Sequence, residues 1–496
     1  MASALPHTEI CLNMNNHQAL KSYPIGYSLI FFSEFISRFA FWGIQSLLVL
    51  YLVSHFSYNH AEAYGIFGVY ASLSWAISIL GGYIADRYLG FRRILLFGFT
   101  FALLGNIFLL TQEKTFLFLG LGFLVLGTGL IIPNNCNMLG TLYEPEDARR
   151  DKGFGTFYVA GNLGAMLAPI LLGYLNEYLG WTWAFSVTGL AFVAWLGMYV
   201  YKRHYLSQKG NFDGDKPRIS FVPFINIDAL IFLLLAFLGL LTSCLLQDSR
   251  ALGYTLALVS LIGLIYLVLS LMRHDLKERL NTLILLAMIF FVLIFFACEF
   301  QTLNSFIIFM REYVNMHWLG LTIPVTAFVS AESMFVVILT FLVANPLWSY
   351  LGDRQPKPFI KLAIGTLLAG ISFLIFAYVA NLAGLGLGKP SLWWMILGVA
   401  IISLGELFVM PPLLSAMTKL APPKIKGTMV GIMYFAISIS GFLSGEIAKL
   451  TASASNSASA YESTYLKLAL FMLLVGGATF LSAWLLKLKK SSGQPL

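Results

Sequence analysis

The chain has 496 residues, of which 58% are hydrophobic and 11% are charged, and its mean hydropathy is +0.80. This composition excludes a soluble globular protein of that length and predicts a polytopic membrane protein. Apolar runs of about twenty residues recur, whereas short runs of alternating polarity do not, so we expect helices and not barrel strands. The net charge of +8 is dispersed over short loops, so we predict no binding to nucleic acid.

Charged or Pro/Gly-rich breaks divide the chain into about fourteen expected transmembrane helices, arranged as six, two and six. They lie near 27–53, 62–85, 92–111, 115–142, 154–176, 182–201, 222–246, 251–272, 282–310, 325–350, 359–381, 392–418, 426–449 and 464–486. The expected parts are a cytoplasmic tail (1–26), a six-helix bundle (27–201), a cytoplasmic linker with two inserted helices (202–280), a second six-helix bundle (281–487) and a cytoplasmic tail (488–496).

The basic residues predict the orientation of the chain in its membrane. If the N-terminus is cytoplasmic, about 24 of the 31 Lys and Arg residues fall in the tails and in the loops on that side. Because short cytoplasmic loops are enriched in Lys and Arg, we expect both termini in the cytoplasm and the protein in an inner or plasma membrane. We also expect a monomer in the lipid bilayer.

The first apolar segment contains an acid and a base, in S-E-F-I-S-R-F-A-F-W-G at Ser33 to Gly43. Glu34 and Arg38 are four residues apart and therefore share one helix face, with Ser37 beside them. Each charge inside a membrane costs about 3 kcal/mol or more, so such residues seldom face lipid. The pattern favours a polar face on a water-filled pathway; the alternative is an ion pair that only orients the helix.

Two features of the first half recur in the second half at nearly the same spacing. The pair Asp86 and Arg87 in G-G-Y-I-A-D-R is matched by Asp353 and Arg354 in W-S-Y-L-G-D-R, and Glu34 is matched by Glu299. Duplicated halves are a known transporter design, with the substrate site between them at mid-membrane. We expect the two Asp-Arg pairs to act as conformational latches between helices at their cytoplasmic ends.

Four stretches resemble the proton-dependent oligopeptide transporter (POT) family of the major facilitator superfamily. They are G-G-Y-I-A-D-R-Y-L-G-F-R-R at Gly81 to Arg93, the first-helix stretch, F-Y-V-A-G-N-L-G at Phe157 to Gly164, and G-E-L-F at Gly405 to Phe408. The resemblance implies the two-bundle fold, alternating access, and uptake of short peptides driven by a proton gradient. We expect no cofactor, no metal and no catalytic residue, because no His/Cys metal spacing or nucleophile motif is present.

The resemblance also implies roles for single residues. Glu34 and Arg38 line the cavity, with Glu34 and Glu299 in proton coupling or gating, and Glu406 binds the amino terminus of a peptide. The remaining substrate-binding residues that it implies are Tyr70, Asn134 and Asn162. From the residues alone, the two asparagines equally fit plain hydrogen bonds between helices, and Glu299 fits a helix break that faces water.

The chain departs from the family pattern at the proposed cavity. Ser37 stands where the family has a second glutamate, Phe41 and Trp42 replace a tyrosine pair, and Ile132 replaces a lysine. An acid and a base are lost together, so no buried charge is left alone. This favours, as an alternative, a member with weaker proton coupling or another substrate, such as a peptide-like drug, an amino-acid derivative, nitrate or another small anion. An intramembrane enzyme is a remote alternative.

Overall fold

The computed structural model describes residues 23–144, 147, 149–206, 209–211, 227–271, 275–318, 320–351, 354–421, 426–452 and 457–491. Nearly all of these residues are helical, and thirteen helices are long and apolar enough to cross a membrane. α9 (Ser249–Leu271) is a further, shorter apolar helix by the same measure. The prediction of an all-helical membrane protein with about fourteen spans is therefore confirmed.

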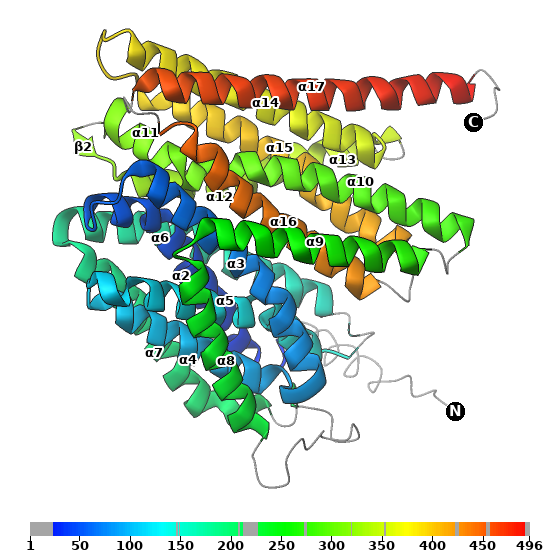
Figure 1. Ribbon diagram of the computed structural model, residues 1–496. Helices are drawn as coiled ribbons and strands as arrows, with labels where there is room; N and C mark the ends of the chain where they lie inside the picture. Colours follow the sequence, from blue (N-terminus) through cyan, green and yellow to red (C-terminus); the bar gives the residue numbers. More distant parts are fainter. Residues whose placement is uncertain are drawn as a thin grey trace, which may run out of the picture.

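The first group of helices occupies the lower part of the view in Figure 1, coloured blue to cyan. It consists of α2 (Tyr27–Ser54), α3 (His60–Ile84), the π-helical η1 (Ala85–Leu89), α4 (Phe91–Leu110), α5 (Lys114–Thr141), α6 (Arg150–Leu179), α7 (Trp181–Lys202) and η2 (Arg203–Leu206). α2 packs against α5, α6 and α7, and α4 packs against α5. These bounds lie within a few residues of the expected ones.

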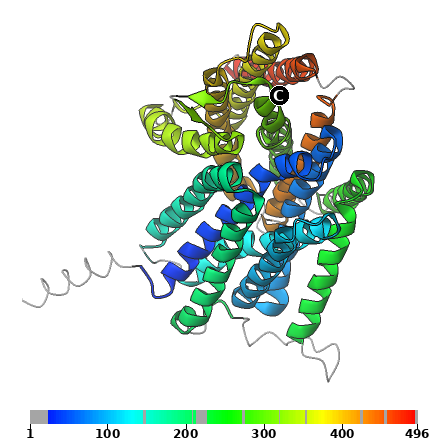
Figure 2. The same ribbon diagram turned by 90° about the vertical axis from the view of Figure 1, so that its left-hand side faces the viewer.

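Helices α8 (Ile227–Leu245) and α9 are inserted between the two groups. α8 packs against α5 and lies on the flank of the first group in Figure 2, whereas α9 contacts α3. Large apolar side chains on α8, such as Leu233, Leu234 and Phe237, are exposed. They would face lipid in a bilayer, where exposed apolar surface has no cost.

The second group contains the remaining helices and a small hairpin. They are α10 (Leu276–Glu299), η3 (Phe300–Leu303), α11 (Ser305–Tyr313), β1 (His317–Trp318), β2 (Leu321–Thr322), η4 (Val325–Phe328), α12 (Val329–Leu339), the π-helical η5 (Thr340–Ala344), α13 (Asn345–Leu351), α14 (Pro358–Gly384), α15 (Leu392–Leu420), α16 (Lys426–Lys449) and α17 (Ala458–Ser491). β1 and β2 pair antiparallel, with His317 opposite Thr322. α14 packs against α15 and α17 at the top of Figure 1.

Local sequence signals explain several helix ends. Asn59 caps α3 in a capping box, in which its Oδ1 accepts from the Glu62 amide at 2.9 Å and the Glu62 carboxylate accepts from the Asn59 amide at 3.2 Å. Gly180 separates α6 from α7 with φ of 88°, a conformation that favours glycine. Two spans expected to be continuous are interrupted, at η3 and at η5.

The two groups meet closely where α3 crosses α16. The backbones approach so tightly that a Cβ atom added at Gly68 would lie 2.8 Å from the Gly445 Cα. Hydroxyl pairs continue this seam, because Ser72 Oγ lies 3.0 Å from Ser438 Oγ and Tyr64 Oη lies 3.0 Å from Tyr461 Oη. His60 Nε2 also lies 3.4 Å from Glu312 Oε1. These contacts close the end of the molecule that carries the α2–α3 loop, which the loop charges predict to be the outer end.

This seam predicts that Gly445→Val separates α3 from α16, because overpacking a tight backbone contact costs about 1–3 kcal/mol. The readout is a disulfide between cysteines placed at Ser72 and Ser438, whose hydroxyls are in contact. Oxidation should cross-link the pair in the parent background and much less with Gly445→Val. Gly431→Val is the matched control, since a Cβ at Gly431 meets only Ile79 at 4.0 Å. Equal cross-linking with both substitutions would contradict this interpretation.

Candidate functional site

The polar face predicted on α2 is buried in the first group. Glu34 is only 3% exposed, and its Oε1 accepts from Arg38 Nε at 2.8 Å. The Arg38 side chain keeps 25% of its surface exposed. The sequence correctly predicted this pair on one face of the helix, because four residues make slightly more than one turn.

Asn135 on α5 connects this face to the neighbouring helix. Its Nδ2 donates to Glu34 Oε2 at 3.0 Å and to Ser37 Oγ at 3.2 Å, and its Oδ1 accepts from Ser33 Oγ at 2.6 Å. Glu34 therefore has a donor on each carboxylate oxygen. Sequence reasoning did not select Asn135.

The neighbouring Asn134, which was predicted to bind substrate, does not contact α2 in the same way. Asn134 is fully buried, and its Nδ2 donates to the Leu130 carbonyl of its own helix at 2.8 Å. Its Oδ1 has no hydrogen-bond partner among the residues that the structure describes. Two adjacent asparagines on one helix point about 100° apart, so only one of them faces α2.

Three carboxylates converge in the second group. Glu299 ends α10, Glu332 lies in the first turn of α12 and Glu406 lies within α15. One oxygen of each lies within 4.8 Å of the other two. The sequence predicted Glu299 and Glu406 but missed Glu332, whose only signal is that it is a lone charged residue in the apolar run 325–350.

The end of α10 explains how Glu299 and Glu332 are held together. The 3-10 helix η3 begins directly after Glu299, and its tight turn places the Thr302 side chain next to the Glu299 backbone. The Thr302 hydroxyl lies 2.8 Å from the Glu299 carbonyl oxygen and 3.1 Å from Glu332 Oε2. Because a hydroxyl has one proton, Thr302 donates to one of these two oxygens at a time. On α15, Ser403 Oγ lies 3.4 Å from the Glu332 carbonyl oxygen.

Glu299 has unusual surroundings for a carboxylate. It is 4% exposed, and neither of its side-chain oxygens has a hydrogen-bond donor in the described part of the chain. Its helix ends at this residue, where the negative end of the helix dipole disfavours an anion. A bound proton or a cation at this position would remove both the cost of a buried carboxylate without a donor and its repulsion by the helix dipole.

Aromatic residues connect the two sets of charges. The Tyr158 hydroxyl on α6 interacts electrostatically with both Glu406 and Arg38, and the Tyr434 hydroxyl on α16 interacts with Arg38 and Glu34. The Tyr434 ring is stacked at 5.9 Å on Trp75, whose ring meets Phe41 edge to face at 5.8 Å. Tyr158 therefore lies near a charge of each helix group, and aromatic side chains lie beside the Glu34–Arg38 pair.

The other two residues predicted to bind substrate are Tyr70 and Asn162, and within the described part of the chain neither forms a hydrogen bond or an ion pair with the charged residues. Tyr70 is fully buried, and its hydroxyl has no partner among the described residues. Asn162 Nδ2 donates to the Tyr158 carbonyl oxygen at 2.9 Å, which places Asn162 on the helix that carries Tyr158.

The predicted latch residues are only partly described. Asp86 and Arg87 are exposed within η1, and Arg354 is exposed at the start of the loop before α14. Asp353 lies outside the residues that the structure describes.

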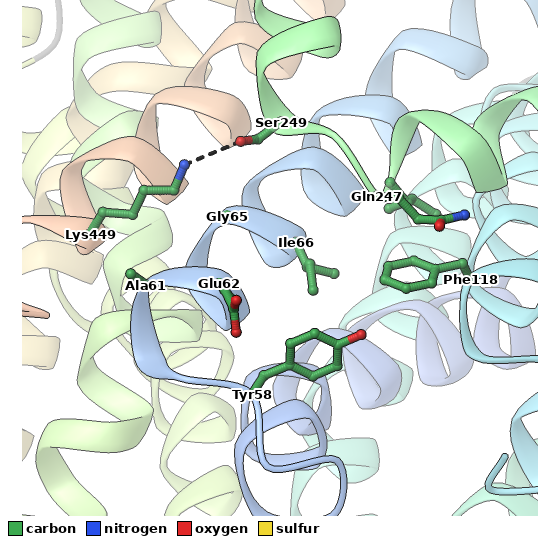
Figure 3. A pocket seen from close by; sticks show the side chains of 10 residues that line it. Tyr58, Ala61, Glu62, Gly65, Ile66, Phe118, Gln247, Ser249 and Lys449 are labelled. Atoms are coloured by element: carbon green, nitrogen blue, oxygen red, sulfur yellow. Dashed lines mark hydrogen bonds between the residues drawn. The ribbon is translucent and has the colours of Figure 1, made fainter. Parts of the chain in front are cut away.

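A cavity of about 470 Å³ lies away from these charges, beneath the turn between α8 and α9 (Figure 3). Lys449 and Ser249 meet at its edge, where Lys449 Nζ lies 3.3 Å from Ser249 Oγ. Glu62, Tyr58 and Phe118 line other parts of it. None of the predicted site residues lines this cavity, so it is separate from the candidate site.

Comparisons with known proteins give one consistent result. The family model for PTR2, the POT family, matches residues 92–464. A di-/tripeptide transporter of Lactococcus lactis is 30% identical over 450 residues, which is 86% of this chain and 89% of that protein. A peptide transporter of Yersinia enterocolitica is 28% identical over 451 residues, 86% of this chain and 87% of that protein.

Solved structures agree with these relatives. The peptide transporter POT in complex with sulfate has a TM-score of 0.80 at 25% identity, covering 93% of this chain and 94% of that one. A POT family transporter in complex with 5-aminolevulinic acid has a TM-score of 0.79 at 25% identity, covering 93% and 96%.

The geometry predicts different effects for the two adjacent asparagines. Asn135→Ala should lower the free energy of unfolding by about 1–3 kcal/mol, because it removes a donor from a buried carboxylate. Asn134→Ala should cost less, because it removes a bond within one helix and also an oxygen without a partner. Thermal unfolding of the two variants in detergent provides the measurement. A larger loss of stability for Asn134→Ala would show that the α2–α5 contact is wrongly assigned.

Proposed function

Because the chain belongs to the POT family, we propose that it is a proton-coupled symporter that takes up di- and tripeptides by alternating access. The observation that carries this proposal is that Tyr158 lies within electrostatic range of Arg38 in one helix group and of Glu406 in the other. Relatives named as peptide transporters support the substrate class. Membership of a transporter family removes the intramembrane enzyme as an alternative.

The charges suggest how a peptide would be oriented. Arg38 is the cation of the site and retains exposed surface, so we assign it to the substrate carboxylate. Glu406 lies on the opposite helix group and is assigned to the substrate ammonium. Asn162 and Asn134 would contribute hydrogen bonds, and Tyr70 would contribute its hydroxyl when the helices rearrange. A short peptide has both charges, which fits a site with opposite charges on its two sides.

Glu299 is the residue we assign to proton carriage. It is buried at a helix end without a donor, and protonation would let it enter a closed site at lower cost. Glu34 is a second candidate, although Arg38 and Asn135 already stabilise its ionised form.

Alternating access requires that the two helix groups separate at one end as they close at the other. The tight seam between α3 and α16 supports closure at the outer end in this structure. We assign Asp86, Arg87, Asp353 and Arg354 to latches at the opposite, cytoplasmic end, with bundles at 27–201 and 281–487 and both termini inside.

The departures from the family motif favour one alternative. Where the family is expected to pair a glutamate and a lysine, this chain has Ser37 and Ile132, and a neutral hydrogen bond from Asn135 links the helices instead. Loss of both charges would weaken proton coupling or change the substrate. An amino-acid derivative is the favoured second substrate class, because a related POT family transporter has been solved in complex with 5-aminolevulinic acid.

Uptake of labelled dialanine into proteoliposomes tests the proposal. With an inward proton gradient, the wild type should accumulate dialanine, and Glu299→Gln should abolish accumulation while still allowing exchange, because a glutamine cannot carry a proton. Glu462→Gln is the control, since Glu462 is half-buried and, within the part of the chain that the structure describes, its carboxylate accepts from Asn381 Nδ2 at 3.0 Å, away from the three-carboxylate cluster.

The possible results separate the alternatives. Equilibration that ignores the gradient would mean a facilitator without proton coupling. Uptake of 5-aminolevulinic acid but not of dialanine would establish the altered substrate class. Full gradient-driven uptake by Glu299→Gln would refute the assigned role of Glu299.

A further inference from the structure

We propose that the three-carboxylate cluster of Glu299, Glu332 and Glu406 selects substrates by charge. Peptides with an additional side-chain ammonium are preferred over neutral peptides, acidic peptides are the poorest substrates, and Glu332 sets this preference. The proposal rests on the proposed function, because it concerns the choice among peptides at the same site.

The ionisable groups of the site do not balance in charge. Glu34 and Arg38 neutralise each other in a pair with an N–O distance of 2.8 Å. None of the three clustered carboxylates forms an ion pair within the described residues, and the charged groups that act on them are one another. When all five groups are ionised, the site has an excess of negative charge that protons or the substrate must neutralise.

The oxygen atoms of the three carboxylates lie close together. A primary ammonium directs three N–H groups at tetrahedral angles, and acceptors about 2.8 Å from its nitrogen are then about 4.6 Å apart. One oxygen from each of the three carboxylates lies within 4.8 Å of the other two, so no pair of these oxygens is too far apart to share an ammonium. The cluster therefore offers acceptors from three different helices to ammonium groups of the substrate.

Within the described ranges, the Glu299 carboxylate is buried without a hydrogen-bond donor of its own. Both of its oxygens are buried, and among the described residues no side-chain N–H or hydroxyl donates to them; the neighbouring Glu332 carboxylate can do so only through a shared proton. An unsatisfied buried polar group is costly and marks a position where a donor is expected to bind. Glu332 is held beside it by the Thr302 hydroxyl at 3.1 Å. The donor that completes the cluster must come from a proton or from the substrate.

The excess negative charge of the cluster distinguishes neutral, basic and acidic peptides. A neutral dipeptide supplies one ammonium, which leaves most of the cluster to be neutralised by protons. A lysine-containing peptide supplies a second ammonium in place of one of those protons, whereas a glutamate-containing peptide adds a further anion to a site that already has an excess. Glu332 contributes to this selection without being needed to hold the peptide backbone, which Arg38 and Glu406 bind.

Competition experiments test the proposal. Uptake of labelled dialanine into proteoliposomes of the wild type is inhibited with unlabelled Ala-Ala, Ala-Lys and Ala-Glu. Ala-Lys should inhibit at a concentration about tenfold lower than Ala-Glu, since one charge pair in a desolvated site is worth at least that factor. Glu332→Gln should bring the two values close together, and Glu332→Asp, which keeps the charge, should preserve the preference.

The failures of the two proposals are distinguishable. If dialanine is transported but all three peptides inhibit equally, the charge selection is wrong and the peptide transporter stands. If dialanine is not transported at all, both fail. If a preference for Ala-Lys is lost on removal of divalent cations with EDTA, the cluster binds a metal ion and not an ammonium, and the proposal is overturned. A preference that survives Glu332→Gln would refute the role of that residue.

Discussion

An ionised side chain inside a membrane needs a counter-charge, a hydrogen-bond donor or a proton, and this requirement determines the organisation of the site. The first helix group satisfies it internally, because Glu34 has Arg38 on one oxygen and Asn135 on the other. The second group does not, because Glu299, Glu332 and Glu406 lie together without a cation among the described residues. The Glu34 carboxylate is therefore neutralised and hydrogen-bonded by the protein itself, whereas the three clustered carboxylates depend on protons or a bound cation.

The packing between the two groups fits the proposed alternating access. Around Gly68 and Ser72 of α3 and Ser438 and Gly445 of α16, the seam is made of glycine backbones and small hydroxyls, and the aromatic stack of Trp75 on Tyr434 lies further along the same two helices. Small residues allow close approach of helices in a membrane, and their contacts separate without pulling large side chains out of a core. The charged site lies where the two groups face each other, so a change in its protonation or occupancy can alter how they pack. Under the proposed function, this would connect binding at the site to closure at the end that carries the α2–α3 loop.

The sequence was sufficient for the helices and for part of the site. Long apolar runs predicted each span, and the four-residue spacing of Glu34 and Arg38 predicted their contact. The choice of Asn134 over Asn135 depended on the rotation of α5 about its axis, which hydrophobicity does not reveal in a helix buried on most sides. Glu332 was missed because a lone carboxylate gains meaning only when α10, α12 and α15 bring it to Glu299 and Glu406. The helix breaks at η3 and η5 lie in apolar segments without a proline or glycine at the break itself.

The central claim is that protons and substrate cations neutralise the same carboxylates. It is tested most directly by counting the protons that the purified protein exchanges with a weakly buffered solution when it binds a peptide. A peptide with an additional ammonium should displace protons from the cluster, so binding of Ala-Lys should release more protons per molecule than binding of Ala-Ala. Equal proton exchange for the two peptides, with both bound to saturation, would contradict the claim.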